Sequence, residues 1–114
     1  MVICVSIPNW HPARLNQLLG HWEKAMRLKR SDAEMVAAYF LGQPKATEKR
    51  LVHLTIHLAK GQRAGDPDSY FKTLLDALVR CGQLKDDSRQ WCELGPVEFV
   101  RTGVRGATIT LEEI

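Results

Sequence analysis

Apolar and polar residues alternate most clearly over residues 51–59, and this period of two predicts a β-strand. One face of the predicted strand is apolar and comprises Val52, Leu54, Ile56 and Leu58. The opposite face comprises Leu51, His53, Thr55 and His57. At about 3.3 Å per residue, His53 and His57 lie about 13 Å apart, which is too far to bind one metal ion unaided. We therefore interpret them as a partly exposed or dimer-facing pair.

Three further strands are predicted from shorter patterns. They cover residues 2–7, residues 88–94 with a continuation at 97–101, and residues 107–111. Gly95 and Pro96 interrupt the second of these strands, because proline cannot donate a hydrogen bond to a neighbouring strand. Residues 102–106 contain two glycines and predict the loop of a closing hairpin.

A period of 3.6 residues predicts an amphipathic helix over residues 69–81. Its apolar stripe comprises Phe71, Leu74, Leu75 and Leu78. Gly82 follows at the position where a glycine commonly ends a helix. On the polar side, acid and base alternate at steps of four, in the order Asp68, Lys72, Asp76 and Arg80.

A second helical pattern runs over residues 13–30, with Gly20 as a candidate break. Its stripe comprises Leu15, Leu18, Leu19, Trp22, Met26 and Lys29. Residues 31–34, Ser-Asp-Ala-Glu, match a capping box, so either a second helix begins there or one long helix is reinforced. This segment carries Tyr39 and Phe40 and is expected to end near Gly42.

The order of predicted elements is strand, one or two helices, strand, helix and a pair of strands. This order predicts an α+β fold in which two or three helices pack on a mixed four-stranded sheet, forming two layers. A length of 114 residues allows one modest hydrophobic core and is too short for two. Residues 1–114 are therefore expected to form a single domain.

Composition excludes several classes of protein. An apolar share of 45% with 25% charged residues is typical of a soluble globule. No apolar run approaches the roughly 20 residues of a membrane span, and the first residues lack the basic stretch of a signal peptide. We therefore expect a cytoplasmic protein with no membrane partner. Cys4, Cys81 and Cys92 form no metal-binding spacing, so we expect reduced, buried thiols, with a zinc site shared with histidine as the alternative.

Charge is unevenly distributed along the chain. Residues 1–64 hold ten Lys and Arg against four Asp and Glu, whereas residues 65–114 hold six against nine. A basic surface for a phosphate backbone beside an acidic metal pocket would produce this asymmetry, and so would a solvated helix face. The candidate phosphate-binding residues are Lys24, Arg27, Lys29, Arg30, Lys60 and Arg63.

Asp66 and Asp68 stand where the chain enters the helix predicted at 69–81, and Lys72 follows one turn later. Two carboxylates this close repel each other unless a cation lies between them, and a hard divalent cation with oxygen ligands is the usual occupant. The same residues also fit a simpler structural role. Asp66 followed by Pro67 is typical of a helix N-cap with proline in the first turn, and Asp68 would suit the helix dipole.

The run GDPDSYFKTLLDALVRCGQLKDD, residues 65–87, resembles the signature of RusA-type Holliday junction resolvases. That family shows Asp-x-Asp-Asn-x-x-Lys, then a helix with an Asp-Ala-Leu step, a glycine and an Asp-Asp pair. The resemblance is strong over this run and looser over the rest of the chain. It implies a RusA-like nuclease domain.

The resemblance also implies catalytic residues and partners. Three family carboxylates fall on Asp66, Asp68 and Asp87, which would bind Mg²⁺ or alternatively Mn²⁺, and the family lysine falls on Lys72. The implied activity is paired phosphodiester cleavage of a four-way DNA junction during recombination and repair, by a homodimer without a nucleotide cofactor. Ser69 replaces the family asparagine, so a weakened enzyme or a non-catalytic DNA-binding module is the alternative.

The position of Asp87 is not fixed by the sequence. A helix over residues 69–81 travels about 20 Å at 1.5 Å per residue. The five-residue return to Asp87 spans at most about 17 Å. Asp87 therefore either folds back along its own helix or completes the site of a partner.

Overall fold

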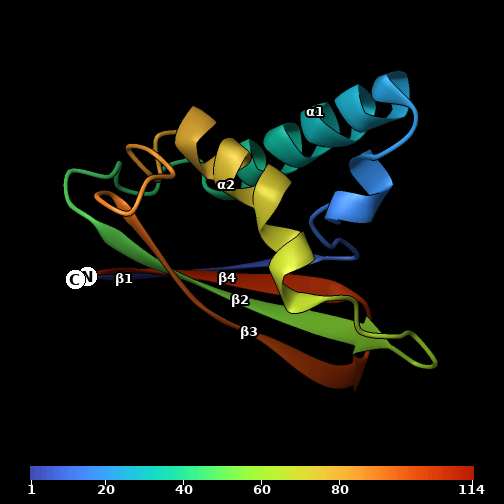
Figure 1. Ribbon diagram of the computed structural model, residues 1–114. Helices are drawn as coiled ribbons and strands as arrows, with labels where there is room; N and C mark the ends of the chain where they lie inside the picture. The colour runs from blue at the N-terminus through green and yellow to red at the C-terminus, as the bar shows by residue number, and fades with distance from the viewer.

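The strand with the clearest alternation, β2 (Arg50–Ala59), takes an inner position in the sheet of the computed structural model, which describes residues 1–114 (Figure 1). The strand order is β1-β4-β2-β3, with β1 at Val2–Pro8, β3 at Cys92–Gly103 and β4 at Gly106–Glu113. β2 pairs in parallel with β3 and antiparallel with β4, while β1 pairs antiparallel with β4. The prediction of a mixed four-stranded sheet is confirmed.

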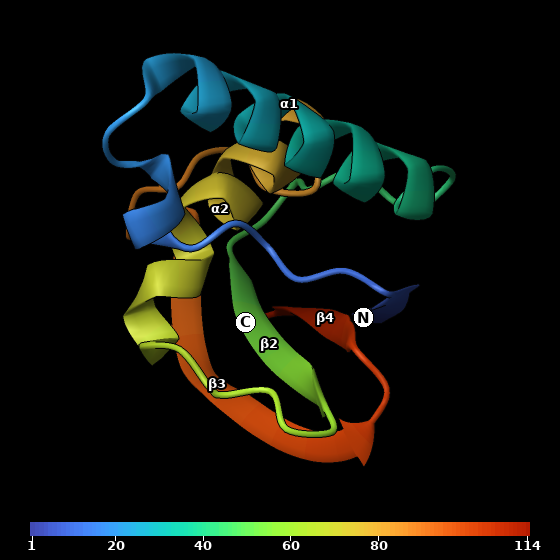
Figure 2. The same cartoon turned by 90° about the vertical axis from the view of Figure 1, so that its right-hand side faces the viewer.

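Two helices, α1 (Trp22–Tyr39) and α2 (Phe71–Arg80), cover one face of this sheet (Figures 1 and 2). Two short 3₁₀ helices, η1 (Leu15–Leu18) and η2 (Pro67–Tyr70), precede them. The apolar residues of β2 point at the helices and are at most 1% exposed. They belong to a cluster of 20 buried residues between the layers, so the predicted two-layer α+β arrangement is also confirmed.

The pattern that predicted α2 describes it well. Phe71, Leu74 and Leu78 are buried against the sheet, while Asp68 and Lys72 face solvent. The helix ends at Arg80, and Gly82 has a φ of +80°, a left-handed conformation that glycine adopts without steric cost.

The predicted stripe of the N-terminal helical segment is wrong. Gly20, with a φ of +94°, separates η1 from α1, so residues 13–30 do not share one helical face. Four members of the stripe are instead exposed: Leu15, Leu19, Trp22 and Met26. The buried face of α1 consists of Ala25, Asp32 and Val36. Because the helix is not continuous through Gly20, the apolar positions before the break do not determine which face of α1 is buried after it.

Of the two alternatives predicted for residues 31–34, the second is observed: no new helix begins there, and α1 continues as one helix to Tyr39. The carboxylate of Asp32 is instead buried between the N-terminal loop and α2. Its Oδ1 accepts a hydrogen bond from Trp10 Nε1 at 3.0 Å, and its Oδ2 accepts from Ala13 N and Thr73 Oγ1, both at 2.7 Å. This network ties residues 10–13 to both helices.

Two predictions about the C-terminal strands need correction. β3 begins at Cys92 rather than at residue 88, because residues 88–91 form a turn in which Cys92 N donates to Ser88 O. Gly95 and Pro96 lie at the irregularity where the β2–β3 register shifts, as their sequence indicated. β3 and β4 do not form a hairpin, since β2 lies between them. An inner position buries the apolar face of β2 more completely than an edge would.

One expectation about a single side chain also fails. Cys4 is exposed rather than buried, whereas Phe40 is 1% exposed and belongs to the core. All three thiols are free. Neither helix has the length and apolar character needed to cross a lipid bilayer.

Candidate active site and basic surfaces

Asp66 and Asp68 lie at the start of η2, after a loop over residues 60–65 that follows β2. Asp66 is the N-cap, with Pro67 in the first turn, and its Oδ1 accepts a hydrogen bond from Asp68 N at 3.2 Å. The capping role proposed from the sequence therefore describes this contact. It occupies one carboxylate oxygen, and both side chains remain exposed and outside the chain's salt bridges.

The side-chain hydroxyl of Ser69 forms a hydrogen bond with the backbone next to these two carboxylates. Its Oγ donates to Asp66 O at 2.6 Å, and its N–H donates to the same oxygen at 3.0 Å. The hydroxyl proton is thus committed to the first turn of η2. Lys72 follows on α2, exposed and without a salt bridge, about one helical turn beyond Asp68.

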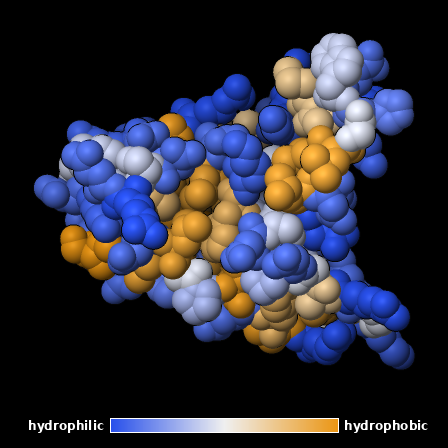
Figure 3. Space-filling model, in the orientation of Figure 1, coloured by the Kyte–Doolittle hydropathy of each residue, from blue (hydrophilic) through white to orange (hydrophobic).

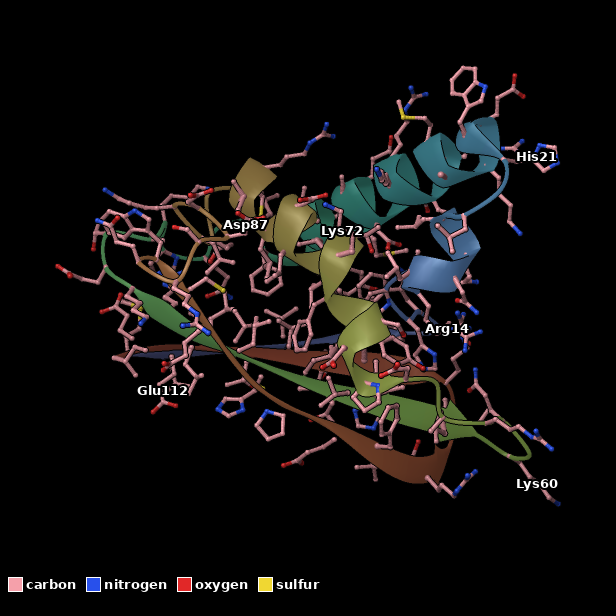
Figure 4. The ribbon with its side chains drawn as sticks, in the orientation of Figure 1. Arg14, His21, Lys60, Lys72, Asp87 and Glu112 are labelled. Carbon is pink, nitrogen blue, oxygen red and sulfur yellow. The ribbon has the colours of Figure 1, made fainter.

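Asp87 returns along its own helix. After Gly82, the N–H groups of Gln83 and Leu84 both donate to Leu78 O and turn the chain back. Asp86 and Asp87 then line a cavity of about 390 Å³ between α1 and α2, whose charged lining residues also include Lys29, Asp76 and Arg80. Figure 4 shows Asp87 beside the C-terminal half of α2, away from the end that carries Asp66 and Asp68.

The three carboxylates implied by the family resemblance do not form one cluster within the chain. No group of three or more His, Cys, Asp or Glu side chains is placed to hold a metal ion. A pair of carboxylates such as Asp66 and Asp68 is nevertheless a ligand set that Mg²⁺ can accept. This ion usually keeps several waters and is bound by one or two carboxylates together with substrate phosphates. Asp87 could add a ligand only after a rearrangement or from a second copy.

The thiols are poor candidates for a zinc site. Burial raises the pKa of the Cys92 thiol, and the nearby negative charge of Asp87 raises it further. Burial likewise raises the pKa of Cys81. A zinc ion would therefore have to displace protons that these thiols hold more tightly than an ordinary cysteine does, and no group of three or more His, Cys, Asp or Glu side chains is placed to hold the ion.

The predicted phosphate-binding residues are all exposed, but they occupy two separate places. Lys24, Arg27, Lys29 and Arg30 lie on α1, where each residue advances by about 100°. Lys29 therefore points nearly opposite to Arg27 and lines the cavity of about 390 Å³ that also contains Asp86 and Asp87. Lys60 and Arg63 lie instead in the loop that follows β2, at the end of the sheet where Figure 4 shows Lys60.

A second cavity, of about 600 Å³, brings together basic residues that the sequence did not indicate. Its lining includes Arg14, Arg63 and Arg105, together with His11. Of these three arginines, only Arg63 is among the phosphate-binding residues predicted from the sequence. Arg14 and Arg105 are not part of any basic cluster or motif along the chain. Arg14 lies next to the acidic pair: a Cβ built on Gly65 would be 2.9 Å from its Cδ and Nη1.

Comparison with models of known protein families found no match to this chain, and comparison with curated proteins found none either.

Proposed function

We propose that this protein is a Mg²⁺-dependent, structure-selective endodeoxyribonuclease that cuts four-way DNA junctions. The observation that carries the proposal is the exposed pair of Asp66 and Asp68 at the start of a helix, with Lys72 one turn later. None of the three is in a salt bridge, so no charge of the chain neutralises theirs directly. The likeness of residues 65–87 to the RusA-type signature supports the same activity.

In this proposal each side chain has a role set by its charge. Asp66 and Asp68 would hold Mg²⁺, or Mn²⁺ in its place, and the ion would supply an activated water and offset charge on the scissile phosphate. Lys72 contacts a non-bridging oxygen and stabilises the charge that develops as the bond to the leaving sugar oxygen breaks. Asp87 would contribute to this site only by rearrangement or from a partner.

The symmetry of the proposed substrate indicates that the protein acts as a homodimer. A four-way junction has two-fold symmetry, and paired cuts need two sites held at a fixed separation. Surface available for an interface includes Trp22, which is 73% exposed, and Tyr39, which is 41% exposed. Figure 3 shows apolar atoms gathered near the start of α1. The half-buried residues of β2 that face away from the helices offer a second surface.

A second candidate is a DNA-binding module with little or no turnover. The hydrogen bond from Ser69 Oγ to Asp66 O favours it, because this side chain offers no amide donor to the metal site or the phosphate. Binding without cleavage would distinguish this candidate from the nuclease.

The decisive experiment incubates a labelled four-way junction with the protein in Mg²⁺ and in chelator. We expect paired cleavage in Mg²⁺ alone and its loss in Asp68→Asn, which should retain or strengthen junction binding because a negative charge near phosphates is removed. Glu98→Gln, which removes an exposed carboxylate on β3, is the control and should cleave normally. Light scattering of the same samples should give the mass of a dimer. Equal cleavage by Asp68→Asn and the parent protein would end the metal-site proposal.

A further inference from the structure

Four strand ends meet at one edge of the sheet. Pro8 at the end of β1 and His57 near the end of β2 both pair with Gly106, the first residue of β4, and Ala59 pairs with Gly103 at the end of β3. The connecting segments 9–14, 60–65 and 104–105 therefore converge there, as Figure 2 shows end-on. Each of these three segments contributes one arginine.

These arginines line the cavity of about 600 Å³. This volume lies within the range of natural small-molecule sites, about 300 to 1,000 Å³. Trp10 and Tyr70 also line it and are only 6% and 2% exposed, so their side chains belong to the fixed wall. The cavity is therefore bounded partly by the packed core rather than by surface loops alone.

The charge inside the cavity is not neutralised by the protein. Arg14, Arg63 and Arg105 form no salt bridge, since both salt bridges of the chain lie elsewhere. Asp32 is the one acidic residue in the lining, and its two oxygens already accept three hydrogen bonds. Burial lowers the pKa of His11, and the charges of Arg105 and Arg14 lower it further, so this ring is neutral at pH 7. The cavity keeps an excess of positive charge.

One of the arginines is held in position by hydrogen bonds. Arg105 Nη1 donates to Asn9 O at 2.9 Å, and Asn9 N donates to Arg105 O at 2.9 Å, which fixes the β3–β4 turn against the N-terminal loop. Arg14 packs over Gly65, where the absence of a side chain leaves room for it. Guanidinium groups match the geometry of phosphate oxygens, and a donor fixed in advance, as Arg105 is, binds an anion with a smaller entropic cost.

We propose that this cavity binds a backbone phosphodiester of a DNA strand, with Arg14, Arg63 and Arg105 as the donors. The inference rests on the proposed nuclease function and extends it. Because Arg14 covers Gly65, the residue before Asp66, the bound phosphate belongs to the strand whose scissile bond lies at Asp66 and Asp68. The cavity thus positions that strand for cleavage.

The test measures binding without catalysis. Wild-type protein and the double variant Arg14→Gln/Arg63→Gln are titrated in chelator with an eight-nucleotide single strand that lacks terminal phosphates. Neither of these guanidinium groups donates a hydrogen bond within the chain, so the variant should remain folded, and thermal unfolding checks this. The control, Lys49→Gln/Arg89→Gln, removes two positive charges at the opposite end of the sheet.

We expect the cavity variant to bind the strand about tenfold more weakly, and the control to stay within about twofold of wild type. Loss of one phosphate contact to a single strand lowers the salt slope by about 0.7, so the slope should fall by up to about 0.7 in the cavity variant alone. Arg14→Lys should bind the strand more tightly than a variant with glutamine at this position but more weakly than wild type. Lysine keeps the positive charge and lacks the planar guanidinium that can donate two hydrogen bonds to one phosphate. If the double variant proves unstable, Arg63→Gln alone should weaken binding of the strand in the same direction, by less than the double variant.

Two outcomes would overturn the inference. One is wild-type affinity and salt slope in the cavity variant. The other is weaker binding of inorganic phosphate or thymidine monophosphate with unchanged binding of the strand, which would make the cavity a site for small phosphates. Junction cleavage is scored separately: a protein that binds strands through the cavity without cutting refutes the nuclease proposal and leaves only the strand-binding role of the cavity.

Discussion

Replacing Asp32 with alanine is expected to destabilise the protein strongly, although Asp32 takes no part in the proposed cleavage chemistry. Its side chain is 4% exposed and accepts hydrogen bonds from Trp10, Ala13 and Thr73. Thr73 Oγ1 retains a second acceptor, Ala13 O at 3.3 Å, so the substitution orphans chiefly the Trp10 indole N–H and the Ala13 amide. Those two donors would be buried without partners.

The magnitude follows from these two orphaned groups. A buried donor left unsatisfied costs about 1–3 kcal/mol, so two give about 2–6 kcal/mol, with a central value near 4. Asp32→Asn should cost less, about 1–3 kcal/mol, because one oxygen acceptor remains while the amide NH₂ faces a donor. A domain of this size has a total stability of only about 5–15 kcal/mol, so the alanine variant would approach the limit of folding.

Urea unfolding followed by far-UV circular dichroism measures these differences, with Glu34→Ala, an exposed acid on the same helix, as the control. The control should stay within about 0.5 kcal/mol of the parent protein. The Trp10 indole N–H resonance should also shift in both Asp32 variants. A change in unfolding free energy below about 1 kcal/mol for Asp32→Ala would contradict the assignment of a buried, fully used carboxylate.

Three further predictions concern the site and its surroundings. Ser69→Asn should raise junction cleavage or leave it unchanged, and a large loss would show that the local site differs from that of the family it resembles. Reversing the charges of Lys24, Arg27 and Lys29 should weaken binding of any branched DNA and flatten its salt dependence by about 0.9 per lost phosphate contact, whereas an unchanged slope would place the DNA on another surface. Because burial lowers the pKa of His11 below its ordinary 6.5, the unfolded chain takes up this proton first as the pH falls. Melting temperature should therefore decline below pH 6.5, and His11→Gln should decline less steeply; parallel profiles would contradict this.

The local patterns of the sequence were sufficient for the elements nearest the candidate site. Alternation over residues 51–59 identified the buried face of β2, and the apolar stripe with Gly82 identified α2 and its end. The adjacency of Asp66, Asp68 and Lys72 also follows from the sequence, because residues this close share the first turns of one helical segment. Such features depend on short-range geometry, which the order of residues specifies directly.

Contacts between distant segments were decided only by the tertiary structure. The strand that lies between β3 and β4 is set by how completely the apolar face of each strand can be buried. The alternation of apolar and polar residues along a strand does not select the strand with which it pairs. The glycine break before α1 turned Trp22 outward and left Asp32 inside, where it is satisfied by groups 19 to 41 residues away. Arg14, Arg63 and Arg105 became neighbours because four strand ends meet at one edge of the sheet. Sequence determined the faces of the elements, and packing determined which side chains those faces bring together.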